Sequence, residues 1–149
     1  MSELDSLYQE ILLDHYRRPR NFGALADPDR AAEGDNPLCG DRVRVEVRLD
    51  GERLAEVGFT GSGCAISTAS ASIMTELVRG HSESEARELC ARFQSALTGG
   101  SAPEALVELG ELAALGGVRE FPMRVKCATL AWHTLRAALV GGKAPVTTE

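Results

Sequence analysis

Residues 42–49, RVRVEVRL, alternate polar and apolar side chains without a break. Successive side chains of a strand point to opposite faces of a sheet, so this pattern predicts a strand with one buried face. Asp50-Gly51 follows at once, and this dipeptide is typical of the tight turn in a β-hairpin. We expect the chain to return as a second strand over about residues 53–60, which gives a small antiparallel sheet.

Helical patterns occupy most of the remaining chain. A first helix is expected to begin after Ser2 and to end before Pro19, and a loop is expected from there to residue 38. Further helices are expected where apolar side chains recur at helical spacing between capping residues and glycines, namely over residues 64–79, 82–97, 101–115 and 122–140. Strands followed by helices predict a single α+β domain over residues 1–149, in which the small sheet packs against a group of helices and a flexible tail begins at about residue 143.

Composition excludes several classes of function. A formal net charge of −6 argues against a nucleic-acid partner, which would require a basic face. The chain has no apolar run of the roughly 18 residues that a membrane-spanning helix needs, so we expect no membrane association. Its acidic N-terminus is unlike a secretory signal. We therefore expect a cytoplasmic protein, whose thiols stay reduced.

The cysteines are then candidates for metal chemistry. Cys39-Gly40-Asp41 places a thiolate and a carboxylate on either side of a glycine, which can adopt a positive φ and let both side chains converge. Cys64 and Cys127 supply two further thiolates. Three sulfurs and one oxygen form a tetrahedral set that suits Zn²⁺ or an iron–sulfur species. From the residues alone, Asp41 can equally be read as an ordinary turn residue.

Two of these cysteines lie near predicted helix starts. The helix dipole and the free N–H groups there lower the pKa of a thiol, which favours the thiolate at Cys64 and Cys127. Arg124 and Lys126 flank Cys127 at a position where the dipole disfavours a cation. We therefore expect an anion nearby; the alternative is that both cations are simply solvated.

The other candidate ligands have structural explanations. Cys90 lies in the middle of a helix on its apolar stripe, so it is expected in the core. His15, His81 and His133 all lie away from the cysteine motifs in sequence, and structural or surface roles are expected for them.

Four motifs occur in order along the chain: DHYRRPRN at residues 14–21, NPLCGD at 36–41, GSGCAIS at 61–67 and RVKC at 124–127. Together they resemble the IscU/NifU-N family of iron–sulfur assembly proteins, and within it the SufU branch, over nearly the whole chain. The resemblance implies a SufE/NifU/IscU-like α+β domain with the ligands clustered at one exposed end. It also implies that the metal or cluster site is formed by Cys39, Asp41, Cys64 and Cys127.

Two departures from the IscU type point to the SufU branch. Scaffolds of the IscU type carry a histidine immediately before the third cysteine, and this chain has Lys126 there. The chain also carries an insertion around residues 99–120, and Arg124 is a further SufU-like feature. The branch implies a zinc-bound sulfur acceptor that serves a cysteine desulfurase, rather than a place where clusters are built.

Three functions remain open. In the first, the chain is at most a sulfurtransferase: Zn²⁺ is held by the four ligands, Cys39 accepts sulfur from the persulfide of a SufS/IscS-like cysteine desulfurase, and Arg124 pairs with the group that leaves the metal. In the second, the same ligands hold a transient [2Fe–2S] cluster, which is handed to downstream acceptor or carrier proteins. In the third, the chain is a structural zinc module with no sulfur traffic.

Overall fold

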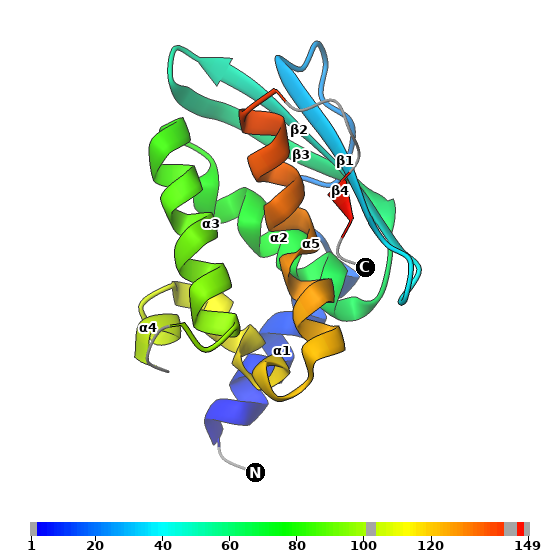
Figure 1. Cartoon of the computed structure of the whole chain (residues 1–149), viewed down its shortest axis with the longest axis vertical. Coiled ribbons are helices and arrows are strands. Elements are labelled where there is room, and N and C mark those ends of the chain that lie inside the picture. The colour runs from blue at the N-terminus through cyan, green and yellow to red at the C-terminus, as the bar shows by residue number, and fades with distance from the viewer. Residues whose placement is uncertain (1–2, 101–103, 142–145, 148–149) are drawn as a thin grey trace.

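A computed structural model of the chain describes residues 3–100, 104–141 and 146–147 (Figure 1). It combines one sheet with a group of helices, so the predicted α+β class is confirmed. The elements follow in the order α1 (Glu3–Arg17), β1 (Arg30–Asn36), β2 (Asp41–Asp50), β3 (Arg53–Ser62), α2 (Ala65–Val78), α3 (Glu83–Leu97), α4 (Glu104–Val107), the 3₁₀ helix η1 (Gly110–Glu120), α5 (Pro122–Leu139) and β4 (Val146–Thr147).

The predicted hairpin is confirmed. β2 and β3 are antiparallel partners, and Gly51 in the turn between them has a φ of 63°, which the tight hairpin turn requires. Three of the four apolar members of the alternating stretch, Val43, Val45 and Val47, are buried, and the fourth, Leu49, is half-buried. One face of β2 therefore contributes to the core, as its sequence pattern predicts.

The loop expected up to residue 38 contains a strand, so that prediction was wrong for Arg30–Asn36. β1 pairs antiparallel with β2, and its inward positions are Ala32, Gly34 and Asn36. None of these is a large apolar residue, so no alternating pattern marks the strand. A Cβ at Gly34 would collide with the side chain of Thr134 on α5. The small inward residues thus let α5 lie close against β1.

The C-terminal region also differs from the expectation. The strand order is β3-β2-β1-β4, and β4 pairs with β1 in parallel, so the sheet is not wholly antiparallel. Val146 and Thr147, which fall within the tail expected from about residue 143, form β4. The rest of that tail, residues 143–145 and 148–149, lies outside the described residues.

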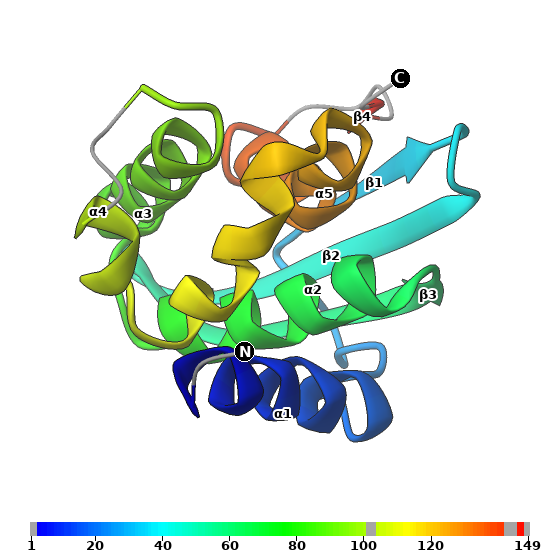
Figure 2. The ribbon, with the colours of Figure 1, turned by 90° about the horizontal axis from the view of Figure 1, so that it is seen from below.

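The helices lie on one face of the sheet. α5 runs across β1 and β2, α2 lies beside it near β3, and α1 packs on the far side of α2 (Figure 2). α3 joins this layer through Phe93, whose ring centroid lies 5.1 Å from that of Trp132 on α5. Both aromatic side chains are buried, and they lie in the same core as the inward valines of β2.

Helix starts and ends follow the local signals. Ser82 caps α3, and both hydrogen bonds of the predicted capping box with Glu85 are present. α5 begins with Pro122, as expected. Among the described residues, no helix has both the length and the apolar character that a membrane crossing requires.

The helix expected up to about residue 115 was wrong. α4 ends at Val107, and η1 continues the chain as a 3₁₀ helix that contains the Gly116-Gly117 pair. Glycines destabilise an α-helix, while the buried Leu112 and Leu115 hold these turns against the core. The capping box expected at residues 101–104 lies largely outside the described residues.

Candidate metal centre

The four predicted ligands come together at one end of the sheet. Cys39 lies in the turn between β1 and β2, and Asp41 is the first residue of β2. Cys64 follows β3 and precedes α2, and Cys127 lies in the second turn of α5. The fold thus joins segments that are far apart in sequence.

The distances between the donor atoms are short. The Sγ atoms of Cys39 and Cys127 are 3.3 Å apart, and the ligand atoms of Cys39, Asp41 and Cys127 all lie within 4.8 Å of one another. Cys64 Sγ lies 3.9 Å from Asp41 Oδ2. Cys39, Asp41 and Cys127 are therefore close enough to share one cation, whereas Cys64 approaches Asp41 but lies outside the group whose ligand atoms are all within 4.8 Å of one another. We call these four side chains the donor cluster.

Asp41 is fixed by the loop that carries Cys64. Its Oδ1 accepts the backbone N–H of Cys64 at 2.8 Å, and the residue is only 1% exposed. A Cβ at Gly63 would lie 2.7 Å from the same oxygen, so the close approach depends on glycine. One carboxylate oxygen is thus anchored, and Oδ2 faces the thiols.

Cys64 caps α2 rather than lying inside its first turn. Its Sγ accepts the backbone N–H of Ser67 at 3.4 Å, a role usually taken by an oxygen side chain. The positive end of the helix dipole therefore faces this sulfur.

Cys127 behaves differently from the expectation for a helix start. Burial raises the pKa of its thiol far above the usual range, and the hydrogen bonds with Cys39 and Asp41 raise it further. The predicted lowering was wrong for Cys127, because desolvation and neighbouring acidic groups outweigh the dipole in the second turn. A cation at this point would attract the thiolate and so offset the shift.

This donor chemistry fits Zn²⁺. Three thiolates and a carboxylate match its preferred tetrahedral N, S and O donors, and acidic groups packed this closely need a cation before all of them can ionise. Two donors, Asp41 and Cys127, are buried, whereas Cys39 and Cys64 are half-buried. The donor cluster is therefore accessible from one side.

Asn36 is a neighbour of the donor cluster that sequence reasoning missed. Its side-chain N–H₂ donates to Cys127 Sγ at 3.6 Å, and the residue is fully buried. Its Oδ1 is a buried atom without a hydrogen-bond partner among the described residues. The residue belongs to the NPLCGD motif, but its contact with Cys127 depends on the packing of α5 against β1.

Arg124 and Lys126 do not contact the donors. Arg124 is exposed in the first turn of α5, and within the described ranges neither side chain forms a hydrogen bond or ion pair. Lys126 is half-buried and is one of the residues that line a cleft between α3 and α5. Arg124 is therefore solvated in this structure, which is the alternative that we considered for both cations.

The remaining cysteine is structural. Cys90 is buried with its Sγ 3.7 Å from the carbonyl oxygen of Trp132, and burial raises the pKa of its thiol to about 12. Its predicted place in the core is confirmed.

The histidines also lie apart from the donor cluster. His15 is buried and bridges Ser72 on α2, at 2.7 Å, and Glu111 on η1, at 3.2 Å. Glu76 and Glu111 lie close enough to His15 to form a second possible ligand group, but both ring nitrogens already have these partners. His81 is exposed beside Glu85, and His133 is half-buried. Structural and surface roles, as expected, account for these positions.

Comparisons with known proteins agree with the shared motifs. The family described as NifU-like N terminal domain matches residues 7–140. The zinc-dependent sulfurtransferase SufU of Bacillus subtilis (strain 168) is 41% identical over 134 residues, which cover 90% of each chain. The iron–sulfur cluster assembly scaffold protein IscU of Streptococcus pyogenes serotype M1 is 42% identical over 139 residues, or 93% of this chain and 86% of that protein.

A solved structure gives the same picture of the fold. It is a candidate iron–sulfur cluster assembly scaffold protein for the SUF system from Fervidobacterium islandicum AW-1. It superposes with a TM-score of 0.81 at 33% identity, and the match covers 90% of this chain and 97% of that one.

Proposed function

This chain belongs to the family of NifU-like N-terminal domains, which serves iron–sulfur cluster assembly, and we propose that it acts there as a zinc-bound sulfur acceptor. Its partner would be a cysteine desulfurase that presents a persulfide. The single observation that carries the proposal is the donor cluster, in which three thiols and one carboxylate from distant segments lie together.

Zinc would be held by Cys39, Asp41, Cys64 and Cys127, and would keep the thiolates deprotonated without adding redox chemistry of its own. The carboxylate of Asp41 is anchored through Oδ1, which leaves Oδ2 as its donor atom. Asn36 donates to Cys127 Sγ, a contact that stabilises a thiolate there.

Cys39 is the best placed acceptor of sulfur. Cys127 is buried on a helix, and Cys64 is held as the cap of α2. Cys39 lies instead in a turn, is half-buried, and is followed by Gly40 with a φ of 72°. Of the three thiols, it can approach a partner with the least rearrangement.

The transfer is balanced without an outside oxidant or reductant. The Cys39 thiolate attacks the outer sulfur of the partner's persulfide. A new S–S bond forms at Cys39 while the partner's S–S bond breaks, and the electron pair of that bond leaves with the partner's cysteine as a thiolate. Cys39 then carries the persulfide sulfur, which passes to downstream iron–sulfur acceptor or carrier proteins.

Exposed apolar side chains lie next to the donors in the chain. Leu38, Phe121 and Met123 are 56%, 58% and 53% exposed. Leu38 precedes Cys39, and Met123 lies one helical turn before Cys127. Large exposed apolar side chains beside an accessible site are typical of a protein–protein contact, which supports a desulfurase docking at this end.

Arg124 is proposed to pair with the thiolate or carboxylate that is released when sulfur arrives. Its side chain is exposed and has no partner within the described residues, so it is free to move toward such an anion.

The test compares three variants in a desulfurase stimulation assay with zinc analysis. Cys39→Ser should abolish stimulation. Arg124→Ala should impair it while bound zinc stays near normal, and Arg30→Ala, at the opposite end of β1, should change neither. Full stimulation by Cys39→Ser would overturn the proposed acceptor, and full stimulation by Arg124→Ala would remove the role of that residue.

A second candidate function is a transient [2Fe–2S] scaffold. It is favoured by the same donor set, because a carboxylate ligand would make a cluster labile, and by the similarity to a protein named as an IscU scaffold. Anaerobic reconstitution, followed by visible absorption and transfer to an apo-acceptor, separates the two functions.

A purely structural zinc module is the least supported alternative. The core is built around Trp132, Phe93 and the valines of β2, and none of the four donors belongs to this hydrophobic cluster. We therefore expect chelation to leave a folded but inactive protein. Cooperative unfolding on metal loss, measured by circular dichroism, would instead favour the structural module.

A further inference from the structure

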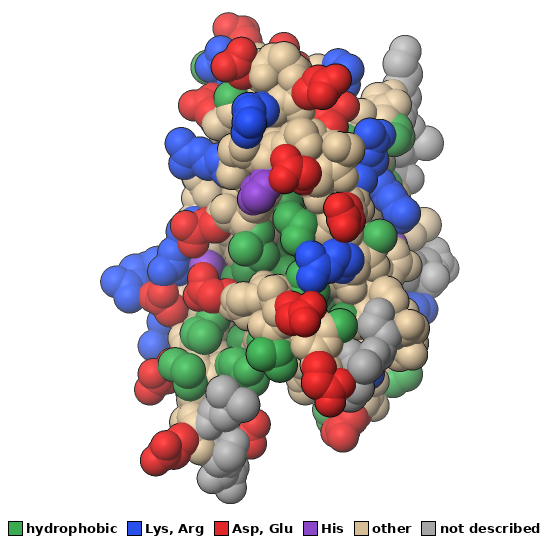
Figure 3. Space-filling view, turned by 90° about the vertical axis from the view of Figure 1, so that its left-hand side faces the viewer, with side chains coloured by type: hydrophobic (Ala, Val, Ile, Leu, Met, Phe, Trp, Pro, Cys, Tyr) green, Lys and Arg blue, Asp and Glu red, His purple; other side chains and the backbone are tan. Residues whose placement is uncertain are grey.

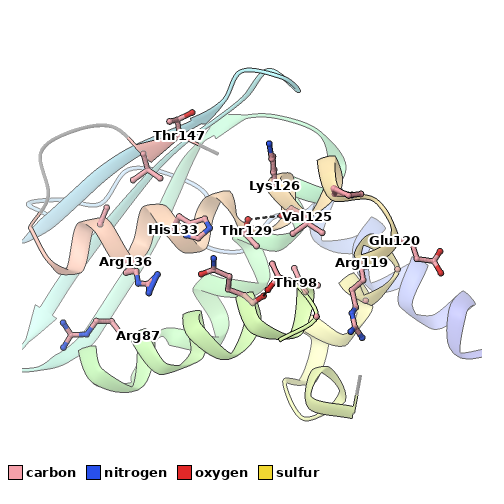
Figure 4. A pocket seen from close by; sticks show the side chains of 18 of the residues that line it. Arg87, Thr98, Arg119, Glu120, Val125, Lys126, Thr129, His133, Arg136 and Thr147 are labelled. Atoms are coloured by element: carbon pink, nitrogen blue, oxygen red, sulfur yellow. Dashed lines mark hydrogen bonds between the residues drawn. The ribbon is translucent and has the colours of Figure 1, made fainter. Parts of the chain in front are cut away.

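A long cleft separates α3 from α5 on the face of the molecule beside the donor cluster. Its volume is about 1300 Å³. Gln94, Leu97 and Thr98 line it from α3, while residues 116–122 close one end (Figure 4). On the α5 side the lining residues are Val125, Lys126, Thr129, His133, Arg136, Ala137 and Val140, which recur at helical spacing on one face.

The charges in this cleft are nearly all positive. Arg87, Arg119, Lys126 and Arg136 line it, and Glu120 is the one acidic lining residue in the described part of the chain. Figure 4 shows the Glu120 carboxylate pointing away from the space between the helices. Within the described ranges, none of the four cations takes part in an ion pair.

This lining contrasts with the rest of the molecule. The chain carries a formal charge of −6, and on the face shown in Figure 3 acidic and basic side chains are interspersed. Unpaired cations gathered in one cleft of an acidic protein create a local positive field, which attracts a negatively charged partner.

The half-buried His133 lies in the positive field of these cations. Burial lowers the pKa of its imidazole, and the charge of Arg136 lowers it further. In Figure 4 the Arg136 side chain points from α5 toward α3, so its guanidinium faces whatever occupies the cleft.

The spacing of the cations sets the size of the occupant. The backbone positions of Lys126 and Arg136 are about 15 Å apart along α5, at 1.5 Å per residue; in Figure 4 Arg136 points toward α3, while the Lys126 ammonium points away from it. A single small anion does not span that distance, whereas an extended peptide does so with about five residues. Between these ends the cleft offers Leu97, Val125 and Ala137, which suit small apolar side chains.

We propose that this cleft binds an extended acidic segment of a partner protein, with carboxylates at its two ends and small apolar side chains between them. The site is separate from the sulfur chemistry of the donor cluster, so it stands or falls independently of the proposed sulfur transfer. A nucleic-acid strand fits less well, because it carries a negative charge at every phosphate, whereas the cleft places apolar side chains between its cations.

The test uses a fluorescein-labelled octapeptide that has two glutamates at each end and Ala-Val-Ala-Val between them. Its binding to the full chain is followed by fluorescence anisotropy. The double variant Arg87→Glu/Arg136→Glu should weaken binding at least about tenfold, because it places two acidic groups opposite the peptide. The matched control Arg30→Glu/Arg79→Glu makes the same change of charge on exposed arginines outside the cleft and should leave affinity within about twofold.

Three further arms decide the class of occupant. A peptide with lysines in place of the glutamates should not bind. Inorganic pyrophosphate and a single-stranded oligonucleotide, each at the concentration of the acidic peptide, should not displace it. The proposal is overturned if the acidic peptide does not bind, if both double variants bind it equally, or if either competitor displaces it. Thermal melts of both variants show that each is folded.

Discussion

The donor cluster has a buried half and an exposed half. Asp41 and Cys127 are almost inaccessible and are held by contacts with Cys64 and Asn36. Cys39 and Cys64 are half-buried, and Cys39 lies in a turn. The buried half is suited to keeping a cation in place, while the exposed half is suited to exchange with a partner. In a sulfur acceptor, both tasks must be done at one site.

The largest expected effect comes from removing one donor from each half. Structural zinc sites contribute about 10–16 kcal/mol over four ligands, so losing Cys127 should weaken zinc binding by on the order of a hundredfold or more. Cys39→Ser should weaken it less than Cys127→Ser, because water can reach the vacated position. Competition with a colorimetric chelator measures both affinities. If Cys127→Ser and Cys39→Ser lose the same zinc affinity, the buried and exposed halves of the donor cluster do not differ in how they hold the cation.

The anchoring of Asp41 can be tested without touching a donor. Gly63→Ala places a methyl group against Asp41 Oδ1, so the carboxylate or the loop must shift. Zinc affinity should fall by roughly ten- to a hundredfold, as for other groups that orient a ligand. The neighbouring exposed Ser62→Ala is the matched control and should bind zinc normally. Normal affinity in Gly63→Ala would mean that the position of Asp41 is not critical.

Asn36 should have a smaller effect on the same affinity. Asn36→Ala removes the N–H that Cys127 Sγ accepts, and zinc binding should weaken by about tenfold. Asn36→Asp, which replaces the donor with an acidic group, should weaken it further. If Asn36→Asp binds zinc as tightly as the natural chain does, the N–H···S contact is unimportant.

Cys90 provides a comparison with a buried cysteine outside the donor cluster. Its pKa is about 12 in the folded chain and roughly 8.5 in an unfolded one. Between these values the folded chain keeps a proton that the unfolded chain has lost, so the free energy of unfolding falls as the pH rises, by up to about 1.4 kcal/mol per pH unit for this group.

Cys90→Ala should therefore lose stability less steeply than the natural chain above roughly pH 9, although it is less stable at neutral pH because of the cavity it creates. Urea denaturation at several pH values measures both slopes. Parallel slopes would show that the buried thiol does not control this dependence.

Local patterns predicted the parts of the fold that local forces determine. The alternation in β2, the turn at Gly51 and the capping box at Ser82 are each fixed by neighbouring residues, and all are present. β1 was missed because its inward residues are small and form no apolar pattern. Their small size is needed because α5 packs closely against the strand. η1 was missed because its turns are held by the burial of Leu112 and Leu115, which depends on distant elements.

The candidate site was predicted to a similar extent. Cys39, Asp41 and Cys64 stand at element boundaries and Cys127 lies in the second turn of α5, and the family motifs single out the same four residues. No local pattern could indicate that Asn36 contacts Cys127 or that burial raises the pKa of Cys127, since both depend on α5 packing against β1.

The most direct measurement is X-ray absorption at the zinc K-edge on the natural chain with one equivalent of Zn²⁺, alongside Cys64→Ser. For the natural chain we expect three sulfur neighbours at about 2.3 Å and one oxygen at about 2.0–2.2 Å, and for the variant one sulfur fewer. A coordination shell with fewer than three sulfurs in the natural chain, or an unchanged shell in Cys64→Ser, would contradict the sharing of one ion by these four side chains.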